Sequence, residues 1–70
     1  MTPNQARRRQ VARDIISHIM IHGHLENQGI TDNSLPVASV LERAGVLTMD
    51  ELKMRFVISD KEKAAFLLHG

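Results

Sequence analysis

Helix start and stop signals constrain the fold of this 70-residue chain more than any other feature of its sequence. Residues 2–5, 48–51 and 59–62 each carry the letters of a capping box, in which two side chains satisfy free backbone amides at the start of a helix. Pro36, which comes after the two candidate cap residues Asn33 and Ser34, adds a fourth start, because proline is tolerated in the first helical turn. These signals predict four helices.

The first predicted helix is the longest. It runs from Pro3 to about His22, and Gly23 supplies the left-handed conformation that commonly ends a helix. Residues 24–33 show no apolar period, so they are predicted to form a loop. A second helix follows and ends at Gly45, and four of its apolar residues share one face, namely Val37, Val40, Leu41 and Ala44.

The rest of the chain is also predicted to be helical. A third helix runs from Met49 to about Val57, and with the second it forms a hairpin, joined at Gly45, that resembles a helix-turn-helix. A fourth helix runs to about His69. Val57 and Ile58 leave two alternatives open, because they suit either the end of the third helix or a short extended segment.

The predicted fold class is therefore all-α: a single domain over residues 1–70, with one long N-terminal helix and three short capped helices. The chain contains no cysteine, which excludes disulfides and thiolate zinc sites. A core of this size is marginal, and three means of stabilisation stay open: regular helix packing, self-association and a histidine metal site. The sequence contains neither an apolar run of membrane-spanning length nor a secretory signal, and we expect a cytoplasmic protein.

Positive charge gathers at one end of the chain, although the net charge is only +1. Residues 1–13 contain no acidic residue and four arginines: Arg7, Arg8, Arg9 and Arg13. Cations near a helix N-terminus oppose the helix dipole, so this placement favours a binding role over a stabilising one. Three interpretations stay open: a solvated basic face, a surface for nucleic-acid phosphates, and a surface for an acidic protein partner.

A second binding candidate is the broad apolar face of the first helix, which includes Ile15, Ile16, Ile19 and Met20. Leftover apolar surface on a small domain often marks an interface. The face is compatible with a symmetric homodimer, with a complex with another protein, or with a well-packed monomer. A conventional helix-turn-helix DNA reader is disfavoured, because Asp50 and Glu51 would then approach the DNA first.

No catalytic constellation is present, and we expect no cofactor. His18 and His22 lie four residues apart, so they are weak candidates for metal ligands. Ile19 follows His18 where zinc hydrolases have a glutamate base, which excludes that reaction class. So short a chain is also expected to have little room for a pocket of several hundred cubic ångströms.

The sequence thus predicts a non-enzymatic small regulatory or inhibitory protein that acts by protein–protein binding. The alternative is a small nucleic-acid-binding regulator that contacts phosphates through the same arginines. Salt separates the two, because binding to phosphates weakens steeply as salt rises.

Overall fold

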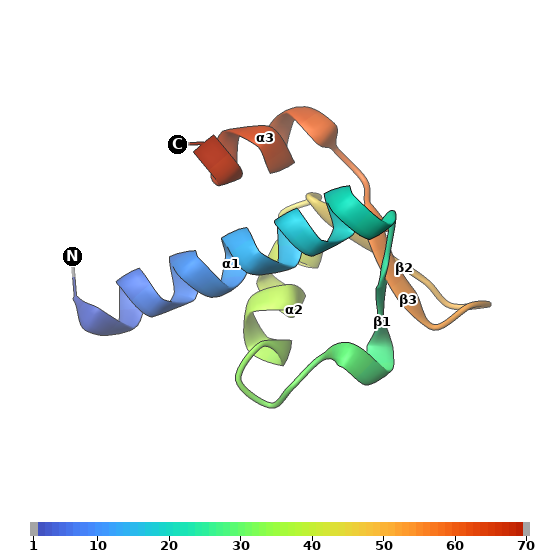
Figure 1. Ribbon diagram of the computed structural model, residues 1–70, viewed down its shortest axis with the longest axis horizontal. Helices are drawn as coiled ribbons and strands as arrows, with labels where there is room; N and C mark the ends of the chain where they lie inside the picture. The colour runs from blue at the N-terminus through green and yellow to red at the C-terminus, as the bar shows by residue number, and fades with distance from the viewer. Residues whose placement is uncertain (1, 70) are drawn as a thin grey trace.

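A computed structural model describes residues 2–69, and it combines three α-helices with a small antiparallel sheet (Figure 1). The sheet has three strands in the order β1-β3-β2. The elements in chain order are α1 (Pro3–His22), β1 (Leu25–Glu26), the 3-10 helix η1 (Asn27–Gly29), α2 (Leu35–Arg43), β2 (Leu47–Asp50), β3 (Arg55–Ile58) and α3 (Lys61–His69).

Helix α1 has the predicted bounds and caps. The Thr2 hydroxyl accepts a hydrogen bond from the Gln5 backbone N–H at 3.2 Å, and the Gln5 side chain accepts one from the Thr2 N–H at 3.0 Å. Gly23 has a φ of 85°, and its N–H donates to the Ile19 carbonyl. Both ends of α1 are therefore fixed by local hydrogen bonds, which is why the sequence predicts them correctly.

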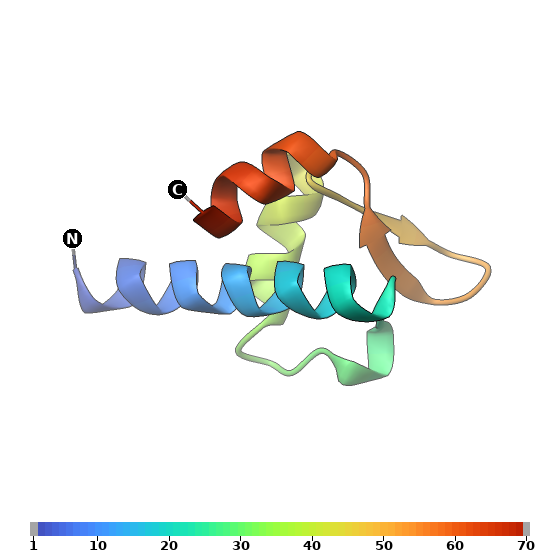
Figure 2. The same ribbon diagram turned by 45° about the horizontal axis from the view of Figure 1, so that its top comes forward.

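The core lies beneath the C-terminal half of α1. Figures 1 and 2 show α2 and α3 on different sides of this helix and the sheet near its C-terminal end, while its first turns project beyond the other elements. Every element except η1 contributes to the core, whose buried residues are Ile15, Ile16, Ile19, Leu25, Val37, Ala38, Leu41, Val46, Leu47, Phe56 and Ala64.

Helix α2 is also confirmed, with Pro36 in its first turn. Ser34 occupies the N-cap position but makes no capping hydrogen bond, because its hydroxyl accepts the Thr31 N–H at 2.9 Å instead. Past the end of the helix, Gly45 has a φ of 83° and turns the chain into β2. Lys63 of α3 donates its Nζ hydrogen to the exposed carbonyl of Ala44 at 3.1 Å, which ties α3 to this corner.

The predicted third helix is wrong, because residues 47–58 form a β-hairpin. Strands β2 and β3 pair antiparallel from Leu47 opposite Ile58 to Asp50 opposite Arg55. Arg55 lies 3.5 Å from the Asp50 carboxylate across the hairpin, so this acid pairs between strands rather than with the amides of a helical turn. Phe56 also pairs with Leu25 of β1, a contact far apart in sequence that local signals do not reveal.

The all-α class and the helix-turn-helix-like hairpin are wrong for the same reason. The protein is an α+β domain with three α-helices and a three-stranded antiparallel sheet. Val57 and Ile58 lie in β3, as the extended alternative predicted. The last helix exists, but Asp60 rather than Ser59 accepts the amides of Glu62 and Lys63, at 3.0 and 3.1 Å.

The loop predicted over residues 24–33 contains β1 and η1. Leu25 is buried and Ile30 is half-buried against the core, so the segment is held in place at two points. Within residues 2–69, none of the helices combines the length and the apolar character that crossing a bilayer requires.

Candidate functional site

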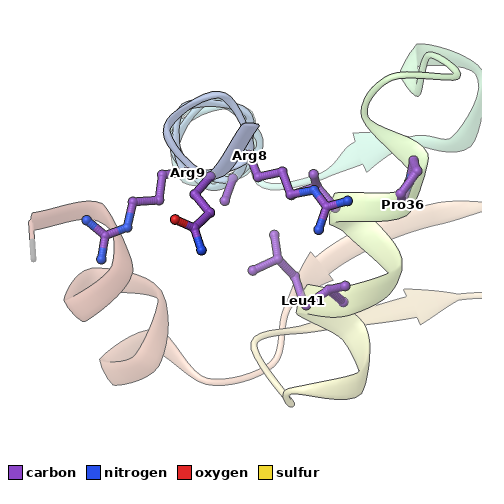
Figure 3. A pocket seen from close by; sticks show the side chains of 8 residues that line it. Arg8, Arg9, Pro36 and Leu41 are labelled. Atoms are coloured by element: carbon purple, nitrogen blue, oxygen red, sulfur yellow. The ribbon is translucent and has the colours of Figure 1, made fainter. Parts of the chain in front are cut away.

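A groove of about 570 Å³ lies between the N-terminal half of α1 and α2 (Figure 3). Four residues of each helix line it. They are Gln5, Arg8, Arg9 and Ala12 from α1, and Pro36, Val37, Val40 and Leu41 from α2. The expectation that so short a chain has little room for a hollow of this size was wrong, because the groove opens between two elements and is not enclosed by the core.

The α1 side of the groove continues the core face of that helix. Its four lining residues follow the spacing i, i+3, i+4 and i+7, which places them on one side of a helix. One turn further on, the same side carries Ile15, Ile16 and Ile19, which are 5%, 0% and 2% exposed. Residues 2–10 are all exposed, so the described chain covers this face only over its C-terminal half.

The α2 side forms the apolar floor of the groove. Val37 and Leu41 are buried where α2 packs on the core, and Pro36 is exposed at the helix start. Val40 is 59% exposed, which is high for a valine in a helix that packs against the core. The helix therefore offers apolar surface to solvent next to the open face of α1.

The two lining arginines lie on opposite sides of the groove. In Figure 3 the side chain of Arg8 extends toward α2, whereas that of Arg9 extends the opposite way, toward the side on which α3 lies. No acidic side chain lines the groove, and neither α1 nor α2 has an acidic residue in its first turn. The edges of the groove are therefore positive and its floor is apolar.

The structure separates the four arginines predicted as a binding surface. Arg8 and Arg9 line the groove, whereas Arg7 and Arg13 do not. Arg7 is exposed on roughly the opposite side of α1, because each residue advances a helix by about 100°. Arg13 is half-buried. The arginines thus point in several directions instead of forming one basic stripe.

The predicted apolar interface on α1 is mostly occupied within the molecule. Ile15, Ile16 and Ile19 lie in the core, and only Met20, at 44% exposed, reaches solvent to a large extent. Sequence reasoning missed Pro36 and Val40 as site residues, because it considered binding surfaces only on the first helix and treated Val40 as one member of an apolar stripe. The predicted stripe is rotated relative to the observed core face of α2, because Ala38 is buried together with Val37 and Leu41, whereas Val40 and Ala44 are exposed.

The histidines lie together on the other half of α1. The rings of His18 and His22 are 4.5 Å apart between centroids, and both line a second hollow together with His24, Leu25, Glu26 and Gly29. His24 lies 3.9 Å from the Glu26 carboxylate. Residues 2–69 contain no group of three or more His, Cys, Asp or Glu side chains arranged to hold a metal ion.

The chemistry of the groove suits binding. Its polar side chains are one amide and two guanidinium groups, none of which acts readily as a nucleophile or general base at neutral pH. Its apolar residues provide buried area to a partner, and the arginines provide charged hydrogen-bond donors at the edges. Comparisons of the chain with protein families, with curated proteins and with solved structures gave no significant match.

Proposed function

We propose that this protein is a small non-enzymatic regulator that acts by binding another protein in the groove between α1 and α2. One observation carries the proposal: the face of α1 that forms the core over Ile15, Ile16 and Ile19 continues, uncovered, over an apolar floor. Contiguous exposed apolar surface on a small domain often marks an interaction site.

The composition of α2 supports a protein partner over a nucleic acid. A helix that reads DNA presents polar or basic side chains to base edges and phosphates. Helix α2 instead brings the apolar side chains of Pro36 and Val40, both exposed, to the groove. An apolar floor has little to contribute to phosphate binding, whereas protein interfaces combine an apolar centre with a polar edge.

Burial within the molecule also favours a different protein over a second copy paired through the C-terminal half of α1. The homodimer predicted from the sequence uses four apolar residues, and three of them already lie in the core. A dimer built on that face would have to open the domain. The groove provides an interface without any such rearrangement.

Site-specific photo-cross-linking tests the proposal. A benzophenone amino acid at Val40 places a reactive group in the groove, and the same residue at Leu52, which is 97% exposed in the turn between β2 and β3, serves as the control. Both positions are exposed, so neither substitution removes a core contact. After irradiation in the source cells, we expect a product from position 40 that contains a second, different protein and is absent from position 52.

Three outcomes overturn the proposal. The first is that both positions give the same products, and the second is that position 40 gives a product that contains nucleic acid. The third is a product with twice the mass of the protein, which itself has a mass of 7.9 kDa. The last identifies a second copy in the groove.

A further inference from the structure

The groove has the form that accepts a helix rather than an extended peptide. Addition of a strand requires a free sheet edge, and recognition of a polyproline segment requires an aromatic-lined groove. Within residues 2–69, only α1 and α2 line this groove, and neither of the chain's two phenylalanines is among the lining residues. Two neighbouring helices with apolar residues at helical spacing leave a channel that a third helix fills by the same ridge-and-groove packing.

The length of the uncovered face sets the length of the segment that binds. The open part of α1 extends from Pro3 to Ala12, which is ten residues or about 15 Å of helix. A bound helix of about three turns therefore spans the groove, and its apolar residues meet Ala12, Val37 and Val40. The core face of α1 would then be covered along its whole length.

The fixed charges around the groove favour an acidic segment. Arg8 and Arg9 line the groove, and the positive end of the α2 dipole lies near Pro36, with no acid in the first turn to offset it. The opposite end of α2 differs, because Lys63 donates to the Ala44 carbonyl there. The groove side of α2 therefore carries positive charge, and no acidic residue of the described chain is among the lining residues.

We infer that the partner of this protein presents an amphipathic helix, with apolar residues toward Ala12, Val37 and Val40 and carboxylates at its edges toward Arg8 and Arg9. This inference rests on the proposed function, since it names the segment that the groove would take. The charge requirement excludes basic amphipathic helices, and the groove geometry excludes extended segments.

Selection from a displayed peptide library tests the inference without knowledge of the partner. The library contains amphipathic helices of about four turns with randomised apolar and edge positions, together with an equal set of extended, proline-containing peptides. Binders are selected on the folded protein and counter-selected on Val40→Asp. We expect enrichment of helical peptides with Leu, Ile or Phe at i, i+3, i+4 and i+7 and with Asp or Glu at the edges.

A charge-swap experiment on one selected peptide tests the edge contacts. Arg8→Glu or Arg9→Glu should weaken binding roughly three- to tenfold, because exposed ion pairs are individually weak. Changing the peptide's facing carboxylate to lysine should restore binding. Arg7→Glu, which makes the same charge change on the other side of α1, is the control and should leave the affinity within about twofold.

The inference is overturned if no helical binder depends on Val40, if basic or proline-containing peptides are enriched instead, or if Arg7→Glu weakens binding as much as Arg8→Glu. The cross-linking experiment separates this failure from a failure of the proposed function. A specific protein product from position 40 together with non-helical or basic selected peptides would retain the protein-binding function and reject the acidic helix.

Discussion

The two halves of α1 present the same face of one helix with different chemistry. In the C-terminal half this face carries three isoleucines, and α2, the sheet and α3 surround it. In the N-terminal half it carries Gln5, Arg8 and Arg9 and no element of the described chain covers it. One half of this continuous helix therefore stabilises the domain through its core contacts, whereas the other half stays uncovered.

The largest expected effect comes from charging the buried half. Ile16 is 0% exposed, so Ile16→Asp places a carboxylate in the core with no partner, and we expect a loss of more than about 4 kcal/mol. A core of this size supplies only about 3–5 kcal/mol, so the variant should be unfolded by circular dichroism. Ile21→Asp, on the same helix at 76% exposed, should remain folded. A folded Ile16→Asp would contradict the assignment of the buried face.

A smaller effect is expected at the C-terminal end of α1. Gly23→Ala forces alanine into the left-handed region at a φ of 85°, and no atom within 4 Å meets the added methyl group. The change therefore isolates backbone strain, and it should lower the free energy of unfolding by about 1 kcal/mol in urea titrations. Gly29→Ala is the control, because Gly29 does not have a positive φ. An equal loss of unfolding free energy in that variant would reject the strain explanation.

The opposite cap should matter less to global stability. Thr2→Ala removes the hydroxyl that accepts the Gln5 amide, a change that costs about 0.5 kcal/mol at an exposed helix start. Because the first turns lie beyond the core, we expect faster amide hydrogen exchange near residues 3–6 and little change in melting temperature. Asn4→Ala provides the control. A Thr2→Ala loss as large as that of Gly23→Ala would mean that the N-terminal half is packed.

The smallest effect on stability is expected from the arginines. Arg7→Ala, Arg8→Ala and Arg9→Ala combined should leave the melting temperature unchanged or slightly higher, because these exposed cations oppose the dipole of α1. Scanning calorimetry at two salt concentrations measures this directly. A clear fall in melting temperature would show that the side chains contribute to packing, and it would weaken the contrast between the two halves.

Local signals account for the parts of the fold that the sequence predicts. The capping box at Thr2, the left-handed Gly23 and the position of Pro36 each act within a few residues, and the predicted bounds of α1 and α2 lie close to the observed ones. The β-hairpin was missed for two reasons. The letters of residues 48–51 also satisfy a capping box, and the turn lacks the Asn-Gly or Asp-Gly pair that usually marks a hairpin.

The hairpin turn instead uses Met54 at a φ of 52°, a conformation that few methionines adopt. Pairing of Phe56 with Leu25 then fixes the sheet, and this contact joins residues about thirty positions apart. Neither feature can be read from a local window. Arg8 and Arg9, two of the four candidate arginines, line the groove, but this division of the candidates and the contribution of Val40 depend on where α2 packs.

The proposed protein-binding surface combines the N-terminal half of α1 with Val40 of α2. Amide NMR on the labelled protein tests whether a partner binds there. A generic DNA duplex is added at low and then at moderate salt, and a selected acidic helix is added to a second sample. We predict that the helix shifts amides of residues 5–12 and Val40 at both salt concentrations, and that the duplex shifts none at moderate salt. Shifts around residues 7–13 that the duplex alone produces and that persist at moderate salt, with Val40 unaffected, would contradict it.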